Sequence, residues 1–434
     1  MQFFNLSNKK ETVSFKEGVL KGAGSGKGLF FPAYVPKLKP DFFETIDALS
    51  LPELAVEVLK DYAGDSFPKA EFEDLCHAAF NFPIPLVNVE DNIFALELFH
   101  GPSLAFKDVG ARFLSEILRK IANERGEKIT VLVATSGDTG SAVAKSFYNV
   151  SGVNVVLLYP SGKVSALQEK TLTTMNKNIH TLEIDGAFDD CQRLVKSAFA
   201  DTQLAGKLKL TSANSINIGR FLPQTVYYFW AWKQLNKATR DNLLISVPSG
   251  NYGNITAGAL AQKMGLPVKQ FVAASNVNKV VPDYLQTGSY EPREATQTLS
   301  NAMDVGDPSN FVRLKTIFNN QHKRIQHSIK SRIATDEETI QAIQQLYNDW
   351  NYLADPHGAV GYVGCKEYVK DYSAGIFMGT AHPAKFKDTV EKAIGEKIEM
   401  PAYLEEIQKQ KKQAEKLSAN YEDFKQWLLA FDQK

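Results

Sequence analysis

Hydrophobic residues form short unbroken runs between about residues 128 and 383, and amphipathic stretches separate these runs. Val, Ile, Leu and Phe dominate each run, and Gly, Pro or Ser closes it. Continuous apolar strands that alternate with helices are typical of parallel sheets covered on both faces. The predicted strands are "KITVLVATSG" (128–137), "VNVVLLYPSG" (153–162), "IHTLEIDG" (179–186), "LLISVPSG" (243–250), "VKQFVAASN" (268–276) and "AGIFMGTAHP" (374–383).

These strands fall into two clusters, with a mainly helical stretch at 190–235 between them. We therefore expect an α/β protein with two open, mostly parallel-sheet lobes flanked by helices and a ligand in the cleft between them. The first 95 residues, which include "LPELAVEVLKDYAG" and "KAEFEDLCHAAFNF", are expected to form a largely helical N-terminal segment. The smaller lobe is assigned to residues 96–235. The larger lobe is assigned to 236–434, with helices at 310–350 and past 396.

Composition excludes several classes of function. Lys plus Arg equals Asp plus Glu at 49 each, so the balance gives no reason to expect a nucleic-acid or anionic-membrane partner. The 3 cysteines, Cys76, Cys191 and Cys365, are far apart and lack the spacing of a disulfide framework or a metal site. No apolar run approaches the ~18 residues of a membrane span, and no secretory signal opens the chain. We expect a cytoplasmic protein.

Three strands end in loops of small and polar residues, where open α/β sheets bind their ligands. These loops are "TSGDTGSA" (135–142), "PSGNYGNITAG" (248–258) and "GTAHPAKF" (379–386). In the second loop, Gly250 and Gly253 permit a tight turn, and the following helix N-terminus supplies N–H donors for an anion such as phosphate. The alternative is an ordinary strand-to-helix turn. None of the loops matches a Walker A or dinucleotide-binding pattern.

The stretch "ELFHGPSLAFKD" (97–108) places Lys107 near the start of an amphipathic helix. A cation there opposes the helix dipole. The same positive potential, with desolvation by Phe106 and Leu104, is expected to lower the amine pKa and favour a neutral nucleophile that forms Schiff bases. The alternative is a lysine whose side chain simply extends past a turn. An amine and a phosphate-binding turn in one cleft describe a pyridoxal phosphate site.

The motifs "HGPSLAFKD", "ATSGDTG", "NSINIGR", "PSGNYGN" and "GTAHPAKF" occur in the order found in threonine synthases with an N-terminal helical extension. The chain resembles this family of fold type II, tryptophan-synthase-β-like pyridoxal-phosphate enzymes from "GLFFP" (28–32) to the last motif. The resemblance implies pyridoxal 5'-phosphate as cofactor. It also implies conversion of O-phospho-L-homoserine and water to L-threonine and phosphate.

The resemblance also implies roles for individual residues. Lys107 corresponds to the Schiff-base lysine, and Thr380 to the hydroxyl residue that faces the pyridine nitrogen. Asp138 stands beside the cofactor ring where related enzymes often carry Asn, which makes its contact with the ring oxygen an open question. The other implied residues are Gly250, Asn251, Tyr252, Gly253 and Asn254 for the cofactor phosphate, and Ser103, Ser136, Thr139, Asn214, Ser215 and Arg220 for the substrate.

Simpler roles stay open for some of these residues. Asn214 and Ser215 could cap a helix that begins near Ile216, and Arg220 could be a surface arginine. His357 and His382 are expected to form structural hydrogen bonds, because Lys107 already supplies the base.

The alternative functions are a serine/threonine dehydratase or a cysteine-synthase-like enzyme of the same fold, and a non-catalytic protein that binds phosphorylated metabolites. The expected partner is a small-molecule substrate, with neither nucleic acid nor membrane, in a monomer or homodimer without a metal.

Overall fold

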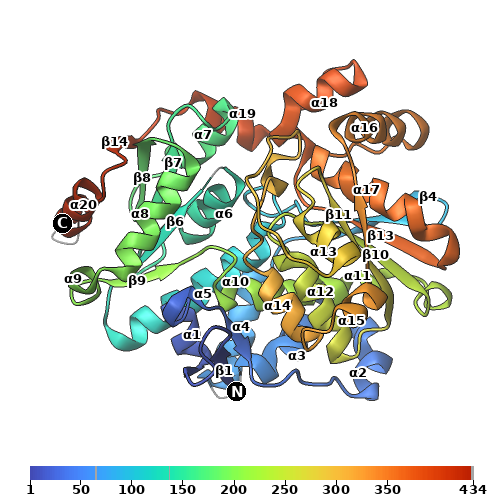
Figure 1. Ribbon diagram of the computed structural model, residues 1–434, viewed down its shortest axis with the longest axis horizontal. Helices are drawn as coiled ribbons and strands as arrows, with labels where there is room; N and C mark the ends of the chain where they lie inside the picture. The colour runs from blue at the N-terminus through green and yellow to red at the C-terminus, as the bar shows by residue number, and fades with distance from the viewer. Residues whose placement is uncertain (64–65, 136, 432–434) are drawn as a thin grey trace. The chain divides into compact units, whose positions relative to one another are not determined.

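The chain folds into two compact units, each built from segments that lie far apart in the sequence (Figure 1). The structure is a computed structural model and describes residues 1–63, 66–135 and 137–431. Apart from Met1, unit 1 comprises Phe31–Phe106 and Phe221–Glu399. Unit 2 comprises Gln2–Phe30, Lys107–Arg220 and the residues from Met400 onward. The boundaries predicted after residues 95 and 235 stay predictions. In this part of the chain, unit 1 passes into unit 2 after Phe106, and unit 2 passes back into unit 1 after Arg220.

Unit 2 contains a five-stranded sheet in the order β14-β8-β7-β6-β9, in which every neighbouring pair is parallel. Its strands are β6 (Ile129–Ala134), β7 (Val153–Pro160), β8 (Ile179–Asp185), β9 (Lys209–Ser212) and β14 (Ala414–Ser418). The three strands predicted for this part of the chain are thereby confirmed. Alternate residues such as Leu132 and Val156 pack with α8 and α20 in one apolar cluster. Their sequence neighbours therefore face the opposite side of the sheet.

The helices of unit 2 are α1 (Phe15–Lys21), α5 (Lys107–Arg125), α6 (Asp138–Phe147), α7 (Ala166–Thr173), α8 (Phe188–Ala200), α9 (Thr202–Ala205), α10 (Ile218–Phe221), α19 (Ala402–Lys409) and α20 (Tyr421–Phe431). α10 ends at the boundary between the units. At the start of the chain, β1 (Gln2–Asn5) and β2 (Thr12–Ser14) form an antiparallel pair.

Unit 1 contains a six-stranded sheet in the order β12-β11-β10-β13-β5-β4. The strands pair in parallel, except for β4 with β5 at one edge. One face packs on α16 and α17, through residues such as Leu244, Val272 and Phe377. The strands are β4 (Leu86–Glu90), β5 (Ile93–Glu97), β10 (Leu243–Pro248), β11 (Val268–Ser275), β12 (Ile329–Ile333) and β13 (Ala374–Gly379).

The helices of unit 1 are α2 (Pro40–Thr45), α3 (Leu51–Ala63), α4 (Lys69–Ala79), α11 (Val226–Gln234), α12 (Gly253–Met264), α13 (Val280–Thr287), α14 (Phe311–Ile317), α15 (His322–Ser328), α16 (Asp336–Trp350), α17 (Pro356–Tyr368) and α18 (Lys387–Ile394). Within the described part of the chain, no helix combines the length and apolar character that a membrane crossing requires.

The fold class predicted from the sequence is confirmed, with differences at the edges of the sheets. The N-terminal segment contains the two predicted helices, α3 and α4, but it also contains β1, β2, β3 (Phe30–Pro32) and β4. The interior strand β5 was not predicted, and neither were β9, β12 and β14. The sequences of β9, β12 and β14, "KLTS", "IKSRI" and "AEKLS", are at least half polar, as is typical of strands at a sheet edge. They therefore lack the unbroken apolar run that marks a buried strand.

Candidate functional site

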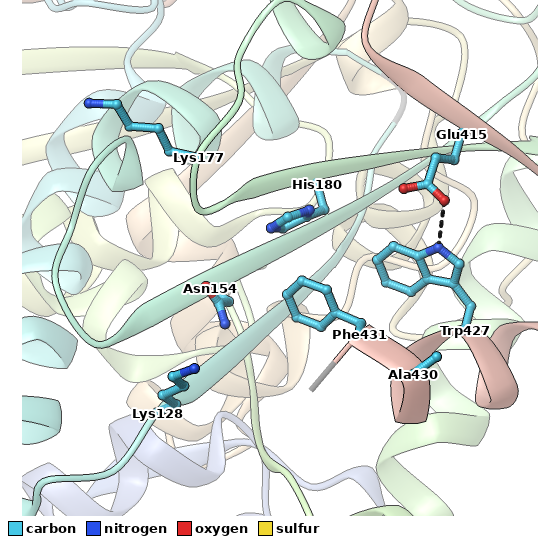
Figure 2. A pocket seen from close by; sticks show the side chains of 8 residues that line it. All are labelled: Lys128, Asn154, Lys177, His180, Glu415, Trp427, Ala430 and Phe431. Carbon is cyan, nitrogen blue, oxygen red and sulfur yellow. Dashed lines mark hydrogen bonds between the residues drawn. The ribbon is translucent and has the colours of Figure 1, made fainter. Parts of the chain in front are cut away.

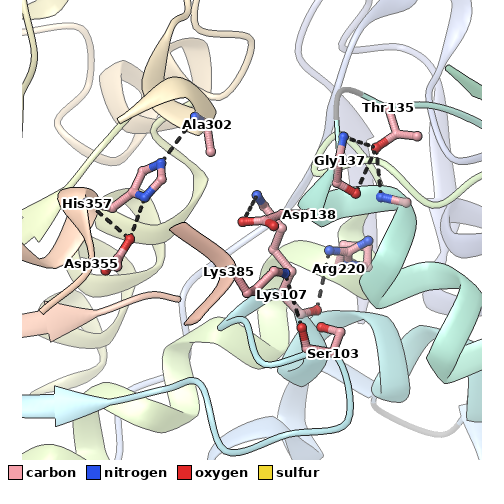
Figure 3. A network of polar contacts seen from close by, with 11 residues as sticks. Ser103, Lys107, Thr135, Gly137, Asp138, Arg220, Ala302, Asp355, His357 and Lys385 are labelled. Carbon is pink, nitrogen blue, oxygen red and sulfur yellow. Dashed lines mark hydrogen bonds and ion pairs between the residues drawn. The ribbon is translucent and has the colours of Figure 1, made fainter. Parts of the chain in front are cut away.

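Lys107 is the first residue of α5, as the helical spacing predicted. Its Nζ lies 4.0 Å from Oδ2 of Asp138, the first residue of α6 (Figure 3). The Lys107 side chain is 17% exposed and that of Asp138 is 5% exposed. The amine therefore lies within ion-pair distance of a buried carboxylate, which favours its ammonium form. The neutral amine expected from the sequence stays a prediction.

Within unit 1, the backbone just before Lys107 pairs with the backbone around Thr380. The Phe106 N–H donates to the Thr380 carbonyl at 2.8 Å, and the His382 N–H donates to the Leu104 carbonyl at 3.0 Å. Leu104 adopts a left-handed backbone with φ 57°, which is unusual for a residue with a branched side chain. This pairing ties the chain that leads into Lys107 to Thr380, whose side chain is buried.

Ser103 belongs to the same turn and is also buried. Its carbonyl accepts a hydrogen bond of 3.1 Å from Nζ of Lys385, a buried lysine in the "TAHPAKF" motif (Figure 3). The two motifs that carry Ser103 and Thr380 are therefore joined through both backbone and side chain. Lys385 was not singled out in the sequence, although its place inside a conspicuous motif was a usable signal.

The loop before α6 is shaped by Thr135, which sequence reasoning missed. The Gly137 and Gly140 N–H groups both donate to the Thr135 hydroxyl, at 3.0 Å and 2.8 Å. This hydroxyl holds the turn that presents Asp138 at the N-terminus of α6 (Figure 3). A threonine directly after a buried strand and before a Gly-rich turn was the available signal. Thr139 follows in the helix and is half-buried, whereas Ser136 lies outside the described residues.

Arg220 is buried, so the alternative of a surface arginine is wrong. Its Nη1 donates to the Ala213 carbonyl, and its Nη2 donates to the Lys107 carbonyl at 3.4 Å. Burial lowers the pKa of Arg220 to about 10, and the Asp108 carboxylate partly opposes this effect. A Cβ at position 110 would lie 2.6 Å from the Arg220 carbonyl oxygen. Gly110 therefore allows α5 and the Arg220 backbone to approach closely.

The other two residues of "NSINIGR" that were singled out lie in the turn before α10. Asn214 donates from its backbone N–H to the Ser212 hydroxyl at 3.2 Å and from Nδ2 to the Ala134 carbonyl at 3.4 Å. Ser215 is half-buried in the same turn. α10 begins at Ile218, two residues later than the capping alternative required. Those two residues therefore do not cap a helix that begins near Ile216.

Asn217, which was not predicted, organises this turn instead. Its Oδ1 accepts the Gly219 N–H at 2.9 Å. Its Nδ2 donates to the carbonyls of Val19 and Ser212, at 2.9 Å and 2.8 Å. The side chain is fully buried. An asparagine directly before a short helix was a usable capping signal, but the bond to Val19 could not be read from the sequence.

The turn between β10 and α12 has the geometry of a phosphate cradle. A Cβ at Gly250 would lie 2.6 Å from the Met303 Cα and 2.9 Å from the Ala302 oxygen, so only glycine fits there. Tyr252 takes a left-handed conformation with φ 59°, and α12 begins at Gly253. The first N–H groups of a helix have no partner inside it and favour an anion. These residues fit the phosphate of a bound cofactor.

The asparagine side chains of this turn shape it from within. The Asn251 Oδ1 accepts hydrogen bonds from the Ser309 N–H at 2.7 Å and from the Ser309 hydroxyl at 2.8 Å. The Asn254 Nδ2 donates to the Pro248 carbonyl at 2.8 Å. Both side chains therefore brace the backbone of the turn from within, and the N-terminus of α12 that follows is the kind of position that favours an anion.

The surroundings of His382 lead us to expect that the free energy of unfolding depends on pH. Its Nδ1 accepts the Ala384 N–H at 3.1 Å, and burial, followed by the His100 charge, lowers its pKa below 6.5. The unfolded chain then binds more protons than the folded chain below this value, so stability should fall as pH drops through about 6.5. Denaturant unfolding between about pH 8 and about pH 5 measures the loss.

The matched variant for this prediction is His382→Asn. Asparagine can still accept the Ala384 N–H but does not titrate. The variant should therefore lose less stability than the parent protein as the pH falls. An equal loss in both proteins would assign the effect to other groups.

A pocket of about 370 Å³ in unit 2 contains none of the predicted site residues (Figure 2). It is lined by Lys128, Asn154, Lys177, His180, Glu415, Trp427, Ala430 and Phe431. Several of these residues lie at the amino ends of β6, β7 and β8. Ligands of open α/β sheets bind at the carboxyl ends. Glu415 accepts the Trp427 indole N–H at 2.9 Å, and the Trp427 and Phe431 rings stack at 5.2 Å.

Three family models cover nearly the whole chain. The pyridoxal-phosphate dependent enzyme family matches residues 81–378. The threonine synthase N terminus matches residues 2–80, and the threonine synthase C-terminal family matches residues 358–428.

Similar proteins and structures agree with these matches. The chain is 46% identical to the threonine synthase of Escherichia coli over 406 residues, which covers 94% of each chain. A crystal structure of the Escherichia coli threonine synthase has a TM-score of 0.93 and 43% identity, covering 99% of this chain and 100% of that one. A threonine synthase from Brucella melitensis with bound PLP has a TM-score of 0.93 and 33% identity, covering 100% of both chains. The chain therefore belongs to the threonine synthase family of pyridoxal-phosphate dependent enzymes.

Proposed function

We propose that this chain is a pyridoxal-phosphate dependent threonine synthase that converts O-phospho-L-homoserine and water to L-threonine and phosphate. The observation that carries the proposal is the full-length similarity to threonine synthases, 46% identical over 94% of the chain in one case. The turn at Gly250–Asn254 supports it, since its shape fits a phosphate and would not accept a Cβ at Gly250.

Lys107 is proposed to be the residue that would hold the cofactor, as the family's Schiff-base lysine, and its amine would also move protons of the substrate. Bound pyridoxal phosphate supplies an electron sink that makes protons at the substrate Cα and Cβ removable. The Nζ of Lys107 is the base for these transfers. Asp138, 4.0 Å away, can stabilise the ammonium form between one transfer and the next. Its contact with the ring oxygen stays a prediction.

Thr380 is proposed to face the pyridine nitrogen. A hydroxyl at this nitrogen does not favour the pyridinium form as strongly as a carboxylate does. The sink is then milder, which suits elimination and addition at Cβ. The Phe106 N–H donates to the Thr380 carbonyl at 2.8 Å, so within unit 1 Thr380 lies beside the turn that precedes Lys107.

The substrate is proposed to be held by residues from three motifs: Ser103, Ser136, Thr139, Asn214, Ser215 and Arg220. Arg220 is the residue best suited to the substrate phosphate, because a planar guanidinium binds phosphate through two parallel hydrogen bonds. We further propose a cytoplasmic location, and a monomer or homodimer that binds no nucleic acid.

A comparison of two products tests the proposed reaction. The purified protein with pyridoxal phosphate is expected to release phosphate from O-phospho-L-homoserine in equal amount to the threonine formed. Keto-acid formation from threonine should be much slower. Rapid keto-acid formation without phosphate release would favour the dehydratase instead. Release of neither product would favour a binding protein.

A further inference from the structure

A buried histidine–aspartate pair lies at the start of α17, away from Lys107 in the sequence and without a role in the proposed reaction. The His357 Nδ1 lies 2.6 Å from the Asp355 Oδ2, and both side chains are under 5% exposed. The His357 Nε2 lies 3.1 Å from the backbone nitrogen of Ala302 (Figure 3). The imidazole therefore connects the N-terminus of a helix to a segment far along the chain.

The hydrogen bonds fix the tautomer of this histidine. A backbone N–H can only donate, so the Nε2 that receives the Ala302 N–H carries no proton. The ring proton is then on Nδ1, from which it is donated to Asp355. Asp355 is itself held in place, because it caps α17 by accepting the N–H groups of His357 and Gly358 at 3.1 Å and 2.9 Å. The Phe386 ring packs edge-on against the imidazole at 4.9 Å.

The segment that His357 holds forms the wall behind Gly250. A Cβ at Gly250 would lie 2.6 Å from the Met303 Cα and 2.9 Å from the Ala302 carbonyl oxygen. Met303 also belongs to one buried apolar cluster with Val360 of α17. The position of the phosphate-binding turn therefore depends on where the Ala302–Met303 backbone lies.

The other flank of this wall has its own anchor. The Asp304 Oδ1 accepts hydrogen bonds from Asn276 at 2.9 Å, Asn278 at 3.1 Å and the Thr298 hydroxyl at 2.7 Å. The Asp304 Oδ2 accepts the Thr298 N–H at 3.0 Å. Asp304 and His357 thus hold the wall from two sides, and loss of one should shift the wall without unfolding it.

We propose that His357 is a positioning residue for the cofactor phosphate. Its Nε2 fixes the Ala302 amide and, through the adjoining backbone, the Gly250 turn whose N–H groups hold the phosphate. This inference rests on the proposed function of Gly250–Asn254 as the phosphate-binding turn. Hydrogen bonds from a backbone cradle weaken steeply when donors move out of line, so a displaced wall weakens the phosphate contacts while sparing those to the aldehyde.

The test compares the affinity of the cofactor-free protein for pyridoxal phosphate with its affinity for pyridoxal, which has the same aldehyde but no phosphate. His357→Phe keeps an aromatic ring for Phe386 and removes the acceptor. His357→Gln keeps an acceptor at similar reach and can still donate to Asp355. We expect His357→Phe to weaken binding of pyridoxal phosphate by about tenfold or more and that of pyridoxal by less than about twofold. His357→Gln should restore most of the difference.

Gly250→Ala is the companion variant, and it separates two kinds of failure. It should lower the preference for pyridoxal phosphate, because the added methyl group displaces the wall or the turn. If Gly250→Ala lowers the preference for pyridoxal phosphate and His357→Phe does not, the positioning role of His357 is overturned and the phosphate-binding role of the turn is retained. If neither variant lowers the preference for pyridoxal phosphate, both the phosphate-binding role of the turn and the positioning role of His357 are overturned. An equal loss of both ligands in His357→Phe, or no rescue by His357→Gln, would show a general structural role and overturn the inference.

Discussion

Replacement of Lys107 by alanine is expected to reduce phosphate release from O-phospho-L-homoserine by roughly 10⁴-fold or more, because the variant would lack the amine that we propose as both covalent anchor and base. The fold should survive. Lys107 is the first residue of α5, its side chain is 17% exposed, and its contact with Asp138 is 4.0 Å long. Turnover, circular dichroism and the melting temperature measure the two effects.

Lys107→Arg is the matched control for this prediction. It keeps a cation beside Asp138, but an arginine stays protonated and cannot form the imine. This variant should be as inactive as Lys107→Ala. That result would show that activity requires the reactive amine of Lys107 and not only its positive charge. Borohydride treatment of the parent protein with cofactor should add the cofactor's mass to the peptide that contains Lys107. Labelling of another lysine, or activity in either variant within tenfold of the parent, would refute the assignment.

Replacement of Arg220 by alanine is expected to lower kcat/KM for O-phospho-L-homoserine by about 10²–10³-fold, because the variant would lose the buried guanidinium that we propose as the partner of the substrate phosphate. Arg220→Lys keeps the charge but loses the two-point fork, so it should fall between the parent and the alanine variant. The inhibition constant of L-threonine, which has no phosphate, should change by less than about threefold in Arg220→Lys.

The structure also supports a competing role for Arg220, which the same experiment tests. Its guanidinium donates to the carbonyls of Ala213 and Lys107, so its loss could disturb the loop rather than the substrate phosphate. Equal losses for phosphorylated and phosphate-free ligands would favour that structural role. Arg119→Lys offers a control on the surface of α5, where Arg119 pairs with Glu116 at 2.7 Å. It should change neither measurement.

Most buried strands were predictable from the sequence and the edge strands were not, although the interior strand β5 (IFALE) was also missed. β6 and β10 are buried along their whole length, and β7 is buried except at Asn154, so each strand is a mainly apolar run that stands out in the sequence. β12 and β14 lie at sheet edges, and their Lys, Ser and Glu residues resemble a loop in the sequence. The hydrogen bonds of an edge strand depend on a neighbour that composition cannot specify.

The candidate site divides in a similar way. Glycines and the side chains proposed for the chemistry, such as Lys107 and Arg220, appear in motifs, because the proposed roles require one residue type. Thr135 and Asn217 brace those motifs through hydrogen bonds to backbone groups. Their roles follow from the approach of the partner segment, as when Asn217 reaches the Val19 carbonyl. A single sequence contains no measure of that distance.

The way the chain is divided between the units has a consequence for its biosynthesis. β14, which joins the sheet of unit 2 beside β8, follows all of unit 1 in the sequence. Lys412, just before it, lies 2.7 Å from the carboxylates of both Glu169 and Glu183. The ribosome must therefore synthesise all of unit 1 before β14 can join the sheet of unit 2 and before Lys412 can form its ion pairs with Glu169 and Glu183. Until then the edge of β8 is open to other strands, and chaperone demand should be greatest in that interval.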